Sequence, residues 1–307
     1  MSDLSVLFCE LTLNNPVIAS SALGISDRAT AEGYADAGAA AVTLAPICDT
    51  GGGPRPAGEI GVDPEAADYS KEIGTRLSAE RTTDLIAEIR QTVEVPVIAS
   101  LRCSRRKWWV TFARQAAKAG AGALELDLSD IDRGADLRAE QWEKRALRAV
   151  DAVKSTVSIP VILKAPYSLT AFGEFVSAAK EAGARGVILS SDRRRLPIDS
   201  KRLERGDEML FGESDRQGIQ YWIAELYRRV GVDLAADLVG PGPESAAAIL
   251  AGAHAVGYGD AAGGVDGLAR AVEGVARWLE SHTFSSVYDA RGRLSRWEKE
   301  KLEDAKG

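Results

Sequence analysis

The sequence has few of the residues that cross-link small secreted proteins or bind transition metals. Its three cysteines, Cys9, Cys48 and Cys103, are widely spaced and odd in number, which indicates neither a disulfide framework nor a zinc cluster. The two histidines, His254 and His282, are also far apart, so we expect no histidine-based metal site. Free thiols are typical of a reducing compartment, and we therefore expect a cytoplasmic protein.

Long apolar runs and an excess of positive charge are missing as well. No stretch approaches about 18 uninterrupted apolar residues, and the N-terminus has no basic segment followed by an apolar one. We therefore expect neither a membrane span nor a signal peptide. The formal net charge is −7, whereas nucleic acids and anionic membranes attract basic proteins. The composition predicts no nucleic-acid partner and no membrane partner. Any site for an anion therefore has to be formed by a local cluster of positive side chains.

What the sequence does contain is a repeated alternation of short apolar runs and segments with a helical period. The apolar runs cover residues 17–20, 41–45, 95–101, 123–128, 160–164, 186–190, 233–239 and 255–258. Most are followed by an amphipathic segment, and several of these segments end at an Ala-Gly pair that can cap a helix. Eight strand-helix units predict an α/β protein with the closed (β/α)8 architecture of a TIM barrel, and a doubly wound open sheet is the weaker alternative.

The segments outside this repeat have their own expected structures. Residues 5–13 are predicted to form an N-terminal β-hairpin. The connections after strands 2 and 6, about residues 46–72 and 192–213, are much longer than the usual βα loop of about 2–6 residues. Both would lie on the C-terminal face as lids or binding loops, although a disordered insertion would look the same. We expect a single barrel domain over residues 1–282 and a polar tail over residues 283–307.

One lysine ends the apolar strand around residues 159–166. A strand buried on both faces would carry Lys164 to the C-terminal end of the barrel, where parallel-sheet enzymes place their reactive groups. A lysine that merely marks the exit of the strand into water is the alternative interpretation. The surrounding repeat of strand-helix units favours the functional one.

The residues at or just beyond the predicted strand ends would form the floor of a pocket. They are Ser20, Ser21, Ala22, Leu44, Arg102, Asp127, Ser129, Lys164, Ser190, Ser191, Asp237, Gly257, Gly259 and Asp260. Two tri-cationic loop segments, residues 105–107 and 193–195, would add positive charge and attract a small anionic molecule. Exposed clusters balanced by Asp130, Asp132 and Asp192 are the alternative.

Glycines mark a further candidate site beside the last two strands. Gly240 and Gly242 precede an alanine-rich helix, and Gly257 and Gly259 follow the last strand. Barrels commonly bind a phosphate between these two loops, because glycine lets backbone N–H groups approach the oxygens. Asp260 complicates this site, since a carboxylate repels a nearby phosphate.

Five segments in this order resemble the dihydroorotate dehydrogenase superfamily of FMN-dependent barrels, especially its divergent dihydroorotate dehydrogenase-like branch. They are LTLNNPVIASSALG, VPVIASLR, WWVTFARQAAKAGAGALELDLS, SIPVILKAPYS and AAAILAGAHAVGYGDA, and the likeness extends from about residue 4 to residue 290. The resemblance implies a TIM-barrel flavoprotein that oxidises or reduces CH–CH groups with FMN. Related barrels often pair, so it also suggests a homodimer.

The resemblance assigns a role to several of the residues named above. The implied FMN contacts are Ser20, Ser21, Lys164, Ser191, Gly240, Gly242, Gly257 and Gly259. Lys164 would stabilise the negative charge that collects on the flavin when it is reduced. Arg102 and Arg193 would bind the acidic group of the substrate, and Asp127 or Ser129 would transfer the proton.

This chain departs from the family at the positions that bind the substrate. Leu44 stands where classical members carry a lysine, Arg102 and Asp127 where they carry asparagines, and the loop after Asp127 has no catalytic cysteine. We therefore expect an FMN-dependent oxidoreductase that acts on a small anionic molecule other than dihydroorotate. A cofactor-free pseudoenzyme that serves as a binding or scaffold barrel is the main alternative. A lyase that uses Lys164 as a Schiff-base nucleophile, with its pKa lowered by burial beside Arg102, is a further one.

Overall fold

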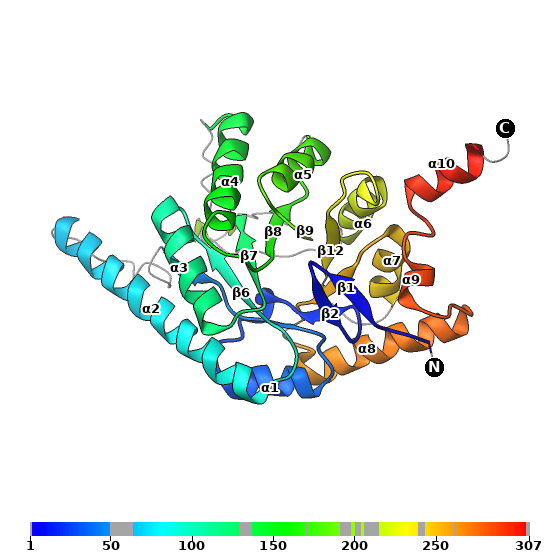
Figure 1. Ribbon diagram of the computed structural model, residues 1–307, viewed down its shortest axis with the longest axis horizontal. Helices are drawn as coiled ribbons and strands as arrows, with labels where there is room; N and C mark the ends of the chain where they lie inside the picture. The colour runs from blue at the N-terminus through cyan, green and yellow to red at the C-terminus, as the bar shows by residue number, and fades with distance from the viewer. Residues whose placement is uncertain are drawn as a thin grey trace.

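The computed structural model describes residues 2–49, 64–128, 137–169, 171–190, 198–199, 204–205, 215–238, 243–260 and 262–304. Its centre is a closed barrel of parallel strands surrounded by helices (Figure 1). The barrel strands are β3 (Val17–Ala19), β4 (Val42–Thr43), β6 (Val97–Arg102), β7 (Ala123–Asp127), β8 (Val161–Pro166), β9 (Gly186–Ser190), β12 (Asp233–Leu238) and β13 (Ala255–Tyr258). Strand β13 pairs with β3, and β4 pairs with β6, which closes the ring. The predicted TIM barrel is confirmed, and the open-sheet alternative is wrong.

The barrel strands are buried along most of their length. All residues of β7 and β8 are buried, because helices cover the outer side of each strand and opposite strands fill the inner side. In the register of the sheet, Ser100 of β6 lies beside Glu125 of β7, and Asp127 lies beside Lys164 of β8. These polar residues therefore meet at the carboxyl ends of the strands.

The helices that surround the barrel follow the strands in the predicted order. They are α1 (Arg28–Asp36), α2 (Pro64–Thr92), α3 (Arg106–Ala119), α4 (Ala139–Lys154), α5 (Phe172–Glu181), α6 (Asp215–Leu226), α7 (Pro243–Ala251) and α8 (Gly264–Ser281). Trp109, Phe112 and Ala116 form the buried side of α3, which packs on the barrel. Gly120 ends this helix with φ of 99°, and its N–H donates to the carbonyls of Ala116 and Ala117, as the Ala-Gly pair predicts.

The two long connections are only partly described. Helix α2 begins at Pro64, so the connection after the second strand ends before the predicted residue 72, and its residues 50–63 lie outside the described residues. Strand β5 (Ile47–Cys48) opens this connection and pairs with β6. The second connection contains β10 (Ile198–Asp199) and β11 (Glu204–Arg205), which pair antiparallel. Both connections start at the C-terminal face of the barrel.

A hairpin covers the N-terminal end of the barrel. Strands β1 (Val6–Phe8) and β2 (Leu11–Leu13) pair antiparallel, which confirms the hairpin predicted for residues 5–13. Phe8 and Cys9 are fully buried, and a Cβ added at Gly186 would overlap the Cys9 sulfur. The hairpin therefore packs against the start of β9, and in Figure 1 it lies in front of the barrel.

The segment after α8 returns to the hairpin. It contains α9 (Val287–Ala290) and α10 (Arg296–Asp304), and the backbone N–H of Val287 donates to the carbonyl of Asp3 over 3.0 Å. Val287 and Ala290 are fully buried, although the sequence predicts a polar tail over residues 283–307. Two small apolar side chains carry this packing, which is too weak a pattern to recognise in a sequence. Among the described residues, no helix is both long and apolar enough to cross a membrane.

Candidate functional site

Lys164 lies inside the barrel at the carboxyl end of β8. Its side chain is 9% exposed, and its Nζ lies 2.6 Å from Asp237 Oδ2. The same nitrogen donates a hydrogen bond to Ser21 Oγ over 3.1 Å. The interpretation of Lys164 as a strand end that projects into water is therefore wrong.

Asp237 connects this lysine to the opposite side of the barrel. Its Oδ1 accepts a hydrogen bond from Ser20 Oγ, 2.7 Å away, at the turn that follows β3. Gly257 lies beside Asp237 in the register, and a Cβ added there would lie 2.8 Å from Asp237 Oδ1. In this structure Gly257 makes room for the bond between Ser20 and Asp237.

Glu125 forms the lower part of the same network and was not among the predicted site residues. Its Oε1 accepts hydrogen bonds from Ser21 Oγ and Ser100 Oγ, each over 2.7 Å, and the residue is 2% exposed. Burial raises the pKa of Glu125, and the positive charge of Lys164 offsets only part of this effect. The alternation of Glu125 and Asp127 on one strand, which puts both on the same face, is the signal that could have found it.

Arg102 and Asp127 form a second ion pair beside the lysine. Arg102 Nε and Nη2 both donate to Asp127 Oδ2, over 3.0 and 2.7 Å. The side chain of Arg102 is 28% exposed and that of Asp127 5% exposed, so the pair lies at the rim of the barrel mouth. Sequence reasoning placed both residues at strand ends but did not predict that they neutralise one another.

The charge on Lys164 follows from these neighbours. Burial alone would lower the pKa of Lys164, but the carboxylates of Asp237, Glu125 and Asp127 together raise it above the ordinary value for lysine. The lysine is therefore protonated at neutral pH. A Schiff-base nucleophile needs a neutral amine, so the predicted lowering of this pKa is wrong and the lyase hypothesis loses its physical basis.

The carboxylate of Asp260 lies just beyond the last barrel strand. Its Oδ1 accepts hydrogen bonds from the backbone N–H groups of Ala262 and Gly263, each over 3.1 Å, at the start of α8. These N–H groups are the kind that would bind a phosphate at a helix N-terminus. Gly259 is half-buried between β13 and Asp260.

The predicted cationic segment 105–107 does not converge on the barrel mouth. Arg105 Nε lies 3.6 Å from Asp49 Oδ2, and Asp49 also accepts the backbone N–H of Ser104. Lys107 lies over the ring of Trp108, in a cavity between α2 and α3. Asp49 and the ring of Trp108 therefore hold the charges of Arg105 and Lys107. The carboxylates expected to balance the two cationic segments, Asp130, Asp132 and Asp192, lie outside the described residues.

Several predicted site residues lie outside the described residues. They are Ser129, Ser191, Arg193, Gly240 and Gly242. The structure brings the other predicted residues Ser20, Ser21, Arg102, Asp127, Lys164 and Gly257 together at one end of the barrel.

A closed (β/α)8 barrel whose charged and hydroxyl side chains meet at the carboxyl ends of the strands has the architecture of the TIM-barrel enzymes. The sequence is 34% identical over 220 residues to a curated protein of Aeropyrum pernix named "Putative dihydroorotate dehydrogenase A (fumarate)", and the alignment covers 69% of this chain and 72% of that protein. The chain belongs to the dihydroorotate dehydrogenase family. No family model matches the sequence.

Proposed function

We propose that the protein is an FMN-dependent oxidoreductase that acts on a small anionic substrate other than dihydroorotate. The observation that carries the proposal is the protonated, buried Lys164 at the carboxyl end of β8, with Ser21 beside it. A fixed cation at this place stabilises negative charge that develops on a bound ring system. Membership of the dihydroorotate dehydrogenase family supports flavin as that ring system.

The residues expected to contact the flavin ring, Lys164, Ser20 and Ser21, fit FMN. Lys164 supplies the positive charge, and the hydroxyl groups of Ser20 and Ser21 supply polar contacts that the protein already holds in place. When bound, FMN would accept or donate a hydride, which none of the side chains described here can do. At the phosphate end, Asp260 already accepts two backbone N–H groups, which are therefore not available to a phosphate, and Gly240 and Gly242 lie outside the described residues.

The remaining residues act on the substrate in this proposal. Arg102 lies at the rim and binds the acidic group of the substrate, sharing its N–H donors with Asp127. Asp127 accepts the proton that leaves the substrate carbon. Glu125 lies deeper in the barrel, and its Oε1 accepts hydrogen bonds from Ser21 and Ser100, so it holds both hydroxyl groups in place.

The substrate differs from dihydroorotate because the polar contacts at the mouth have changed. Leu44 is fully buried and offers no hydrogen bond, and Arg102 and Asp127 form an ion pair in place of two amide side chains. An ion pair binds a charged group, whereas amides recognise the alternating donors and acceptors of a pyrimidine ring. A small carboxylate therefore fits the site better than dihydroorotate.

A cofactor-free binding barrel is the second candidate, and a specific observation favours it. Asp237 neutralises Lys164 over 2.6 Å, and its other oxygen accepts a hydrogen bond from Ser20, so the charge of the lysine is paired without a cofactor. A ligand that uses Lys164 has to share it with Asp237. This candidate predicts a protein that binds a small anion at Arg102 and takes up no flavin.

The absorption spectrum distinguishes the two candidates. The full-length protein is purified, incubated with FMN and desalted, and its visible spectrum is recorded beside that of Lys164→Met. We expect flavin bands in the native protein and weakened bands in the variant. A matched change of the exposed Lys144 to Met should leave the bands unchanged. A native protein that stays colourless after incubation would refute the FMN proposal.

A second variant separates loss of binding from loss of folding. Lys164→Met leaves Asp237 buried without its partner, so the double variant Lys164→Met with Asp237→Asn removes both charges together. Once flavin is bound, anaerobic reduction by small carboxylates is compared with reduction by dihydroorotate. Faster reduction by dihydroorotate than by any other acid tested would contradict the substrate part of the proposal.

A further inference from the structure

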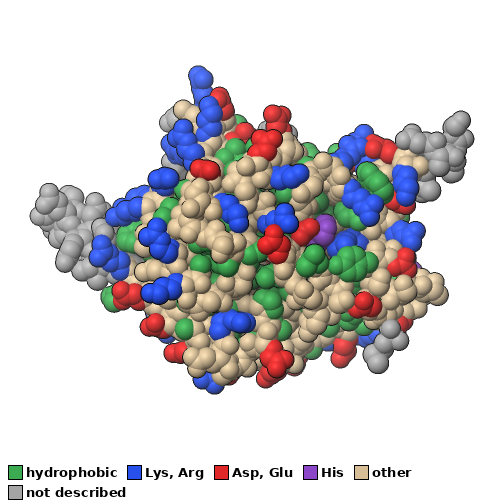
Figure 2. Space-filling view, viewed as in Figure 1, with side chains coloured by type: hydrophobic (Ala, Val, Ile, Leu, Met, Phe, Trp, Pro, Cys, Tyr) green, Lys and Arg blue, Asp and Glu red, His purple; other side chains and the backbone are tan. Residues whose placement is uncertain are grey.

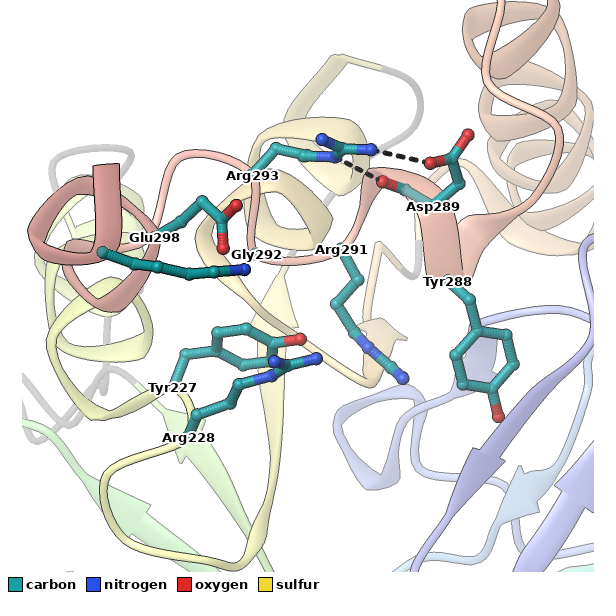
Figure 3. A pocket seen from close by; sticks show the side chains of 9 residues that line it. Tyr227, Arg228, Tyr288, Asp289, Arg291, Gly292, Arg293 and Glu298 are labelled. Carbon is teal, nitrogen blue, oxygen red and sulfur yellow. Dashed lines mark hydrogen bonds and ion pairs between the residues drawn. The ribbon is translucent and has the colours of Figure 1, made fainter. Parts of the chain in front are cut away.

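A cavity of about 280 Å³ lies on the N-terminal side of the barrel, at the opposite end from Lys164. It opens between the chain just after α6 and the segment that contains α9 and α10 (Figure 3). Its charged lining residues are Arg228, Arg291, Arg293, Lys301, Asp289 and Glu298. Figure 2 shows Lys and Arg side chains gathered on the face of the molecule where α10 joins the barrel.

The cavity has more positive than negative charge. Arg293 is neutralised by Asp289, to which its Nη2 donates over 2.8 Å. Within the described part of the chain, no ion pair involves Arg228, Arg291 or Lys301, and Glu298 is the one carboxylate left in the lining. Three cations therefore face one carboxylate, which leaves a surplus of two positive charges.

Aromatic rings hold these cations in place without neutralising them. The guanidinium of Arg291 lies 4.4 Å from the ring centre of Tyr288, and that of Arg228 lies 4.5 Å from the ring of Trp297. Lys301 Nζ lies 5.2 Å from the same tryptophan ring. Because a ring attracts a cation through its face but carries no charge, the three groups keep both their charge and their N–H donors.

The guanidinium of Arg291 provides a second, independent observation. Its Nε and Nη1 atoms are buried, and neither has a hydrogen-bond acceptor among the described residues. Figure 3 shows the side chain extending into the cavity between Arg228 and Tyr288. Buried donors in folded proteins nearly always have an acceptor, so these two N–H groups are available to an acceptor other than the described residues.

We propose that this cavity binds the phosphate group of a small molecule. A phosphate dianion matches the two surplus positive charges, and its several oxygens can accept from guanidinium groups that approach from different sides. The volume admits a phosphate with a small attached group. A nucleic acid would be repelled by the net charge of −7 on the chain and by Asp289 and Glu298 at the cavity. The proposal does not depend on the reaction at Lys164.

Calorimetric titration of the full-length protein with inorganic phosphate tests this site. One series contains saturating FMN and the other contains none. Phosphate that binds at the barrel mouth would be displaced by FMN, whereas phosphate in the cavity would not. We expect saturable binding in both series, weakened at least about tenfold in Arg291→Gln, which removes the charge that faces the cavity. A native protein with no saturable binding in either series would overturn the proposal.

Two further variants complete the test. Arg228→Gln changes an exposed side chain, so it should fold even if Arg291→Gln does not, and it should also weaken phosphate binding. Arg277→Gln changes another exposed arginine, on α8 and outside the cavity, and should bind like the native protein. Native affinity in both Arg228→Gln and Arg291→Gln would refute the site. Tighter binding of glycerol phosphate than of inorganic phosphate would identify a phosphate ester as the ligand, and the reverse order would identify free phosphate.

Discussion

Lys164 Nζ and Asp237 Oδ2 lie 2.6 Å apart, although the strands that carry them are separated by β9. The closure of the barrel brings them together, and Ser20 fixes the second oxygen of Asp237 from a third strand end. The positive charge of the lysine therefore has an internal partner before any ligand arrives. Any ligand that binds to Lys164 has to share it with this carboxylate.

Replacing Asp237 by Asn tests how much this pair contributes to stability. The amide keeps the shape of the side chain but removes its charge, so the buried ammonium loses its strongest partner. We expect the free energy of unfolding to fall by about 1–3 kcal/mol in urea titrations at neutral pH. The matched change Asp151→Asn alters an exposed carboxylate without an ion pair in the described structure and should stay within about 0.5 kcal/mol of the native value. Equal stability of the two variants would show that the pair is energetically neutral.

A methyl group at Gly257 should disturb the same pair from the other side. The added Cβ would lie 2.8 Å from Asp237 Oδ1 and 3.4 Å from Ser20 Cβ, and the hydrogen bond between these residues leaves neither free to move. We expect Gly257→Ala to lower the free energy of unfolding by about 1–3 kcal/mol. The comparison is Gly74→Ala in α2, where a Cβ would meet nothing within 4 Å. That variant should gain about 0.5–1 kcal/mol, because alanine loses less backbone entropy in a helix. Changes of the same sign in both variants would contradict this account.

Much of the barrel could be predicted because each strand is one short apolar run. The run around residues 159–166 became a strand buried at every position, and the hairpin over residues 5–13 formed as expected. Helix α2 begins at Pro64, earlier than the sequence indicated, because the sequence of its first half lacks a visible helical period of apolar residues. Local pattern therefore predicts where an element lies better than where it begins.

Only the site residues that lie at the ends of strands could be predicted from the sequence. Lys164, Arg102 and Asp127 were placed correctly at the carboxyl ends of their strands. Glu125 was missed because it lies two residues before the end of β7, and only residues at or beyond the strand ends were considered as site residues. The direction of the Lys164 pKa was predicted wrongly for a related reason. It depends on three carboxylates from β7 and β12 whose proximity requires the closed ring.

Glu125 should make the stability of the protein depend on pH. Burial raises its pKa in the folded protein above the ordinary value of 4.5. As the pH rises from this value through the folded pKa, the unfolded chain releases a proton that the folded protein keeps, so the free energy of unfolding falls. Glu125→Gln removes this effect. The stability of the variant relative to the native protein should therefore rise with pH across this window.

The measurement is a series of urea titrations from acidic to neutral pH. Each unit by which the folded pKa exceeds the unfolded one corresponds to about 1.4 kcal/mol of relative stabilisation in the variant. Glu181→Gln, a change of an exposed carboxylate on α5, is the control and should follow the native curve. A constant difference between Glu125→Gln and the native protein at every pH would show that Glu125 is ionised to the same extent in both states.

His254 should have the opposite effect on stability from Glu125, since its pKa is lowered to about 4. Burial is the main cause, and the positive charge of Arg291 adds to it. The backbone N–H of Leu234 donates to His254 Nδ1 over 3.1 Å, so the neutral ring carries its proton on Nε2, which lies 3.3 Å from Asp233 Oδ1. Between its unfolded pKa of 6.5 and a pH of about 4, the unfolded chain takes up a proton that the folded protein does not. The free energy of unfolding should therefore fall as the pH falls through this window, by up to about 3 kcal/mol.

Proton NMR tests this directly, because the chain has two histidines and each variant removes one signal. His282→Gln leaves the His254 resonance, which should begin to shift only as the pH approaches about 4. The exposed His282 makes this variant a suitable stability control, since it should keep the acid sensitivity of the native protein. His254→Gln should lose that sensitivity over the same window, because its amide does not titrate there. A His254 resonance that titrates at the ordinary value of 6.5 would mean that Asp233 fully offsets burial and Arg291, and the titration of His254 would then not change the stability with pH.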